Sequence, residues 1–160
     1  MGILLNPNNA DFRMDFKSKI YIDKSMLIEE TNSIIGTGTR FVCISRPRRF
    51  GKSMAANMLT AYYSCGCDSK EFFDKLKISE TDDYIEYLNK YNVVHINMVQ
   101  YMGEAGSVEE LISFITEDLY DELSTEFPDV RQPARKTLIK MFHSFLLSTN
   151  GTVYSARKKQ

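Results

Sequence analysis

The sequence predicts an α/β fold in which helices flank a mostly parallel sheet. Short runs that are apolar at every position, typical of strands buried on both faces, alternate with longer runs whose apolar residues recur at helical spacing. Strands that alternate with helices in this way usually form a parallel sheet. The composition, with 43% hydrophobic and 26% charged residues over 160 positions, is that of a globular domain rather than a disordered chain.

Three apolar segments are the expected strands. Residues 41–44, Phe-Val-Cys-Ile, are apolar throughout and predict the first strand, and residues 93–98 predict the second. Residues 152–154 follow an Asn-Gly turn and would begin a third.

Helices are expected where apolar residues recur every three or four positions. Asp23 is expected to cap a short helix, and two capping boxes, Asp68 with Glu71 and Ser107 with Glu110, indicate two further helix starts. The expected helices after Asp23 cover residues 53–63, 68–76, 82–89, 107–127 and 133–147. We expect residues 1–15 to be a loose arm, 16–154 a partial domain and 155–160 a basic tail.

Charge and cysteine content exclude several classes of protein. The formal net charge of -1 gives the whole molecule no attraction to nucleic acid or to acidic membranes. No apolar run reaches the ~20 residues of a membrane span and the start lacks the pattern of a secretory signal, so we expect a cytoplasmic protein. Cys65-Gly66-Cys67 resembles half of a metal site, but the two histidines, His95 and His143, lie at no metal-binding spacing from it.

The segment that carries chemistry is residues 46–53, Arg-Pro-Arg-Arg-Phe-Gly-Lys-Ser. It matches the phosphate-binding pattern G-x-x-x-x-G-K-[ST] between a strand and a helix, except that Arg46 replaces the first glycine. Gly51 would let the backbone approach a phosphate, Lys52 would supply an ammonium, and Ser53 a hydroxyl for a magnesium ion. Pro47 favours an extended residue before it, so Arg46 can continue the strand and the turn should fall between Arg48 and Gly51.

Together with residues 21–28, Tyr-Ile-Asp-Lys-Ser-Met-Leu-Ile, the segment at residues 41–53 that contains this loop resembles the AAA-ATPase-like family of bacteria and archaea. In that family an arginine at the first glycine position is usual, and a nuclease-like domain often follows at the C-terminus. The resemblance extends over roughly residues 13–150, and it is most specific in the loop.

The resemblance implies a P-loop ATPase domain that binds ATP or ADP with Mg²⁺. In such ATPases the strand before the loop lies between the fourth and fifth strands of the sheet. The resemblance therefore also implies that the expected first strand lacks its neighbours here, which would leave an unpaired edge through which copies of the chain could self-associate. Ser53 would be the metal ligand, and Tyr21 and Ile22 correspond to a segment that contacts adenine in related ATPases. The implied nucleotide-binding residues are Arg48, Arg49, Phe50, Gly51, Lys52, Ser53, Met54, Tyr21 and Ile22.

The acidic residues that such a site needs for hydrolysis are missing from the expected position. The family places carboxylates at the end of an apolar strand after a helix like 133–147, where they hold magnesium and orient water. No residue after Asp129 is acidic, so we expect a truncated member that binds nucleotide without hydrolysing it. Asp23, Asp82 and Asp118 are possible substitutes, but none ends an apolar strand.

Two other functions remain open from the sequence. The protein could bind nucleic acid by charge and stacking. The charge would come from Arg46, the loop arginines and the basic tail, and the stacking from Phe41, Phe50 and Tyr62. Alternatively, the helices at 107–127 and 133–147 could form a surface for another protein.

Overall fold

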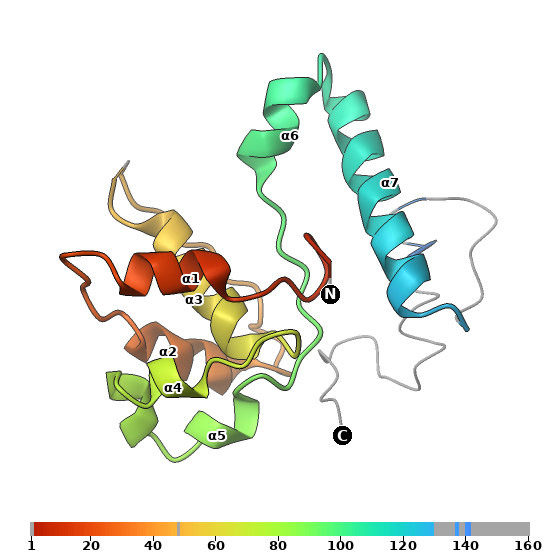
Figure 1. Cartoon of the computed structure of the whole chain (residues 1–160). Coiled ribbons are helices and arrows are strands. Elements are labelled where there is room, and N and C mark those ends of the chain that lie inside the picture. Colours follow the sequence, from red (N-terminus) through yellow and green to blue (C-terminus); the bar gives the residue numbers. More distant parts are fainter. Residues whose placement is uncertain (1, 48, 130–136, 138–139, 142–160) are drawn as a thin grey trace. The chain divides into compact units, whose positions relative to one another are not determined.

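The structure, a computed structural model, describes residues 2–47, 49–129, 137, 140 and 141. The chain divides into two compact units, one of residues 6–93 and the other of residues 2–5 with the described residues from 94 onward. The first unit contains the short helices shown in Figure 1: α1 (Ala10–Phe16), α2 (Met26–Ile34), α3 (Lys52–Tyr63), α4 (Lys70–Phe73), η1 (Lys77–Glu80) and α5 (Tyr84–Tyr87). The second unit contains α6 (Met98–Glu104) and α7 (Val108–Glu126).

The predicted parallel sheet is wrong for the described part of the chain, which is helical and contains no strand beyond isolated bridges. Residues 41–44 were expected to be buried on both faces, yet Phe41 is 83% exposed and Val42 53% exposed. Residues 93–98 contribute one antiparallel bridge, between Leu5 and Val94, before α6 begins at Met98. A strand exists only with a partner that accepts its hydrogen bonds, and the described residues provide none for 41–44.

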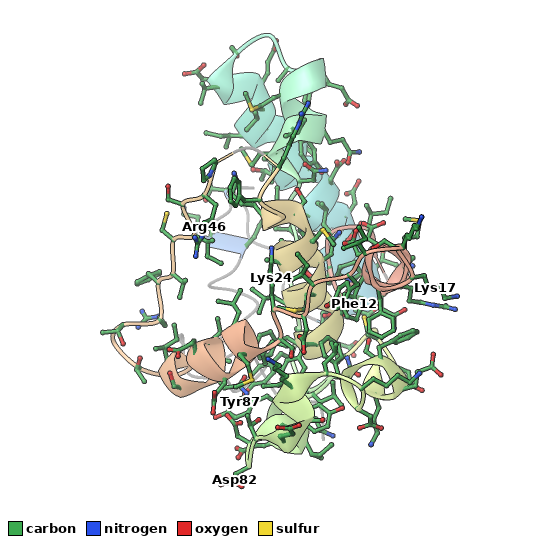
Figure 2. All side chains as sticks on the ribbon, turned by 90° about the vertical axis from the view of Figure 1, so that its left-hand side faces the viewer. Phe12, Lys17, Lys24, Arg46, Asp82 and Tyr87 are labelled. Atoms are coloured by element: carbon green, nitrogen blue, oxygen red, sulfur yellow. The ribbon has the colours of Figure 1, made fainter. Side chains whose placement is uncertain are left out.

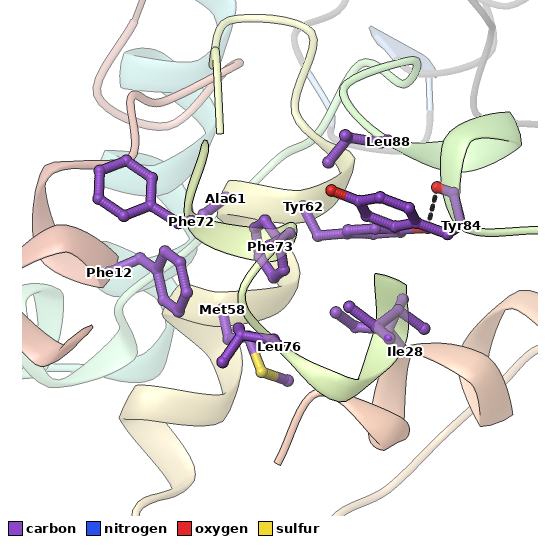
Figure 3. Close-up of a cluster of buried hydrophobic side chains, with 11 residues drawn as sticks. Phe12, Ile28, Met58, Ala61, Tyr62, Phe72, Phe73, Leu76, Tyr84 and Leu88 are labelled. Atoms are coloured by element: carbon purple, nitrogen blue, oxygen red, sulfur yellow. Dashed lines mark hydrogen bonds between the residues drawn. The ribbon is translucent and has the colours of Figure 1, made fainter. Parts of the chain in front are cut away.

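An aromatic core in the first unit is built around α3. Phe12 of α1 is stacked on Phe73 of α4, with ring centroids 4.9 Å apart, and both side chains are buried. Figure 3 labels both residues within this core. Tyr62 of α3 is fully buried and its hydroxyl donates to the carbonyl oxygen of Tyr84 at 2.7 Å. Burying aromatic rings of this size stabilises the unit by a few kcal/mol each. Residues 1–15, expected as a loose arm, thus contain a helix that completes this core.

The second unit is held together by α7. Its N-cap, Ser107, accepts a hydrogen bond from the N–H of Glu110, while Glu110 accepts one from the N–H of Gly106. These bonds confirm the helix start that the sequence predicts, although the glutamate reaches one residue further back than in a standard capping box. Leu119 and Leu123 of α7 pack with Leu4 and Leu5 in a second core.

Other predicted helix starts differ in detail. The box at Asp68 is wrong: α4 begins at Lys70 after Ser69, without a side-chain cap. Asp23 accepts the N–H of Ser25 at 2.8 Å instead of capping the first turn of α2. Of the expected helix at 82–89 only residues 84–87 are helical. The segments expected as a helix at 133–147, a strand at 152–154 and a basic tail at 155–160 lie outside the described residues, apart from isolated positions of the first.

Candidate functional site

The loop at residues 46–53 turns sharply and leads directly into α3. Arg49 has a φ of 68° and Gly51 a φ of 73°, whereas Phe50 between them does not have a positive φ. The turn therefore lies where the sequence places it; Arg48 itself is outside the described residues. Alternation of φ sign directs successive N–H groups into one concavity, an arrangement that binds anions in phosphate loops.

The N-terminus of α3 follows this turn directly. Gly51 is the N-cap of the helix, and no side chain caps its first turn. Uncapped N–H groups and the helix dipole make this end of a helix favourable for negative charge. Lys52 and Ser53, the first two helical residues, are both exposed and can therefore meet a ligand from solution.

The Lys52 side chain runs back along its own loop. Its ammonium donates hydrogen bonds to the carbonyl oxygens of Arg46, at 2.5 Å, and Pro47, at 3.1 Å. The lysine thereby closes the loop between its first residues and the helix. The exposed Arg46 and Pro47 precede the turn, but Arg46 does not continue a strand, since residues 41–46 form none in the structure.

A pocket of about 350 Å³ lies beside the loop and within the first unit. It brings together Tyr21 and Ile22, which come before α2, with Arg49, Phe50 and Gly51 of the loop. Met54 contributes from the first turn of α3, and the wall is mainly apolar. Six of the predicted nucleotide-binding residues thus share one pocket, while Lys52 and Ser53 follow its Gly51 in the exposed first turn.

Lys24 is a member of this pocket that the sequence analysis did not single out. Its ammonium donates a hydrogen bond of 3.0 Å to the carbonyl oxygen of Phe50. The same nitrogen lies 2.8 Å from where a Cβ on Gly51 would stand. Figure 2 labels Lys24 beside α3. The Gly-Lys-Ser pattern gave no signal for it, because Lys24 is distant in sequence and only the fold brings it to the loop.

Residues 21–25 are held in place by hydrogen bonds to η1. Asp23 accepts the N–H of Lys77 at 3.0 Å, and the buried hydroxyl of Ser25 accepts the N–H of Ile78 at 3.1 Å. Burial opposes ionisation of the Asp23 carboxyl, but the donated N–H groups of Lys77 and Ser25 outweigh it and lower its pKa. Burial, together with the charges of two nearby carboxylates, raises the pKa of Tyr21 to about 12. The segment beside the pocket is therefore a fixed wall.

A model of the family described as Predicted AAA-ATPase matches residues 10–155. The chain belongs to this family. No curated protein and no solved structure gives a significant match. The loop, the pocket and α3 all lie inside the matched region of this AAA-ATPase family member.

The pocket of this AAA-ATPase family member has no acidic side chain among its described lining residues. Asp23 is engaged with the backbone of Ser25 and Lys77, and Asp82 is exposed at the edge of the view in Figure 2. Asp118 belongs to the second unit, where it accepts a hydrogen bond from the Tyr101 hydroxyl at 2.7 Å. None of the three carboxylates considered from the sequence lines the pocket.

The three aromatic residues considered for stacking on nucleic-acid bases differ in their exposure. Tyr62 is fully buried and cannot stack on a base, whereas Phe41 is exposed and lies under the guanidinium of Arg40 at 4.7 Å. Phe50 is exposed and lines the pocket.

The unpaired sheet edge expected to drive self-association has no counterpart in the described residues, because the sheet is absent there. No helix in the described part of the chain is long and apolar enough to cross a membrane.

Proposed function

We propose that this chain is an ATP-binding, P-loop ATPase-like domain that holds the phosphates of a magnesium–nucleotide. The observation that carries the proposal is the position of Gly51, Lys52 and Ser53 at the uncapped N-terminus of α3, directly after the turn at Arg49. Membership of an AAA-ATPase family supports ATP or ADP as the ligand. The domain that we propose, residues 16–154, lies within the matched region.

The phosphates would lie in the concavity of the loop. The N–H groups from Phe50 to Met54 would point at phosphate oxygens, and Gly51 leaves room for them because it has no Cβ. Lys52 now donates to two neutral carbonyl oxygens. A phosphate oxygen is charged and accepts a stronger hydrogen bond, so exchange of partners on binding is favourable. Arg49, and Arg48 beside it, would raise the local positive potential.

The adenine base would occupy the pocket next to the loop. Its volume of about 350 Å³ is in the range of small-molecule sites, and its wall is largely apolar. Tyr21, Ile22 and Met54 are among the residues that line it. Because hydrogen bonds to η1 fix residues 21–25, little ordering would be needed on binding, which favours affinity.

Magnesium would enter with the nucleotide. The Ser53 hydroxyl is exposed at the start of α3 and suits a hard oxygen-preferring cation as one ligand. The described residues contain no cluster of three histidine, cysteine or acidic side chains that could hold a metal ion. Phosphate oxygens and water would therefore supply the remaining ligands, and the ion would neutralise charge between the β- and γ-phosphates.

The test is calorimetric titration of Mg-ATP into wild type and the Lys52→Ala variant. Loss of a charge-assisted contact of ~1.5–3 kcal/mol should lower ATP affinity about ten- to a hundredfold. Lys17→Ala removes the same charge from an exposed position outside the pocket and should bind as wild type does. Equal ATP affinity in wild type and Lys52→Ala would refute the assignment.

A further inference from the structure

Lys24 meets the phosphate loop from a separate part of the chain. It stands just before α2, in the segment that Asp23 and Ser25 anchor to η1. Its ammonium bonds the carbonyl oxygen of Phe50, the residue between the two loop positions with positive φ. The anchored backbone and the hydrogen bond to Phe50 therefore hold this charge next to the loop.

Within the described residues, the protein takes up only part of the hydrogen-bonding capacity of this ammonium. A lysine has three N–H donors, and within the described chain Lys24 has one hydrogen-bond partner, Phe50, and no carboxylate in an ion pair. Its side chain is exposed, so the remaining donors face solvent and the pocket that Lys24 lines.

Positive charge accumulates around the loop, and no carboxylate of the described residues is paired with it. Lys24, Arg49 and Lys52 lie at or beside the N-terminus of α3, which is itself the positive end of the helix dipole. None of the three pairs with a carboxylate in the described part of the chain, where Lys70 and Asp74 do form an ion pair. Such a cluster is repulsive by itself and is stabilised by a multiply charged anion.

We propose that Lys24 is a second phosphate-binding lysine of the nucleotide site, acting alongside Lys52. The inference rests on the proposed nucleotide-binding function. Lys24 would donate to an oxygen of the β- or γ-phosphate while it keeps the Phe50 carbonyl as its other partner. It would thereby link the wall formed by Tyr21 and Ile22 to the loop that holds the phosphates.

Affinity should then depend on the number of phosphates. A lysine that binds the β- or γ-phosphate adds more to the binding of ATP and ADP than to that of AMP, because AMP lacks those groups. A lysine that only positions the loop through Phe50 would affect all three nucleotides alike. The ratio of ATP to AMP affinity therefore separates binding from positioning.

The experiment titrates ATP, ADP and AMP, with Mg²⁺, into wild type and the variants Lys24→Met, Lys24→Arg, Lys17→Met and Lys52→Ala. Lys24→Met should lose about tenfold or more in ATP affinity and clearly less in AMP affinity. Lys24→Arg keeps the charge and should stay closer to wild type than Lys24→Met. Lys17→Met, an exposed charge loss that Figure 2 labels away from Lys24, should change nothing. Thermal unfolding by circular dichroism checks each fold, and Lys24→Gln replaces Lys24→Met if that variant does not fold.

The outcomes separate this inference from the function on which it rests. If Lys24→Met binds ATP as wild type does, or loses ATP and AMP affinity equally, while Lys52→Ala is weakened, the role of Lys24 is refuted and the proposed function stands. If wild type binds none of the nucleotides, or Lys52→Ala binds ATP unchanged, both are refuted.

Discussion

The carboxylate of Glu122 accepts the backbone N–H of Leu4 with both of its oxygens, at 3.1 and 3.0 Å. The same carboxylate accepts the N–H groups of Ile3 and Leu5, each at 2.7 Å. One side chain of α7 therefore satisfies three consecutive main-chain donors. Leu4 and Leu5 are thereby held where their side chains are buried in the second core.

Glu122→Ala should release residues 3–5 from α7. Leaving these donors without their partner should cost about 1–3 kcal/mol in the stability of this unit. Hydrogen exchange measured by NMR should show loss of protection at the amides of Ile3, Leu4 and Leu5. Asp121→Ala, which removes a neighbouring exposed carboxylate, is the control and should leave that protection intact. Unchanged exchange at all three amides in Glu122→Ala would contradict the arrangement.

Gly51→Ala should weaken nucleotide binding more than it weakens the fold. Both Gly51 and Gly36 have strongly positive φ, 73° and 79°, so alanine at either position should cost roughly 1 kcal/mol of backbone strain. At Gly51 the new Cβ would also meet the Lys24 ammonium, whereas at Gly36 no atom lies within 4 Å. Thermal unfolding should thus be similar for the two variants, while calorimetry should show lower ATP affinity only for Gly51→Ala. A matching loss of affinity in Gly36→Ala would argue against a local effect at the loop.

Tyr62→Phe should destabilise the first unit, since it removes the donor to the carbonyl of Tyr84. We expect a loss of about 1–3 kcal/mol at neutral pH, measured by chemical unfolding followed by circular dichroism. An unfolding free energy within experimental error of wild type would contradict this role of the hydroxyl.

The contribution of Tyr62 should also depend on pH. Burial, only partly offset by the Asn32 hydrogen bond, raises the pKa of Tyr62 from 10.0 to about 12. When folding raises the pKa of a group, the group contributes its full stabilisation of the folded state at pH values below its pKa in the unfolded state. This stabilisation is lost as the pH rises through the pKa of the group in the folded state. The difference in unfolding free energy between wild type and Tyr62→Phe should accordingly be constant below pH 10 and shrink between pH 10 and 12, by on the order of 2 kcal/mol. A difference that grows over this range would have the wrong sign.

Turnover of ATP by this chain should be negligible even where binding is tight. No carboxylate lines the described wall of the pocket, so none is placed there to hold magnesium or to orient the attacking water. A steady-state phosphate-release assay with Mg²⁺ should give equal background rates for wild type and Lys52→Ala. Sustained release that disappears in Lys52→Ala would instead identify an active site completed by another carboxylate.

The sequence by itself determined the features that depend on neighbouring residues. The helices Lys52–Tyr63 and Val108–Glu126 follow from local apolar periodicity, and the cap at Ser107 from a hydroxyl that reaches a nearby N–H. The turn before Gly51 follows from the restriction that Pro47 places on its neighbour and from the freedom of glycine. These interactions span only a few residues, so the local sequence pattern is enough to predict them.

Only the tertiary structure decided what depends on distant partners. Residues 41–44 have the composition of a buried strand, but without a paired backbone in the described chain they are exposed, and the predicted sheet is absent there. Likewise, the loop motif contains no sign of Lys24, which reaches Phe50 because Asp23 and Ser25 are bound to η1. The absence of the sheet and the position of Lys24 both depend on hydrogen bonds between segments far apart in the sequence. The periodicity of apolar residues along the chain does not predict such bonds.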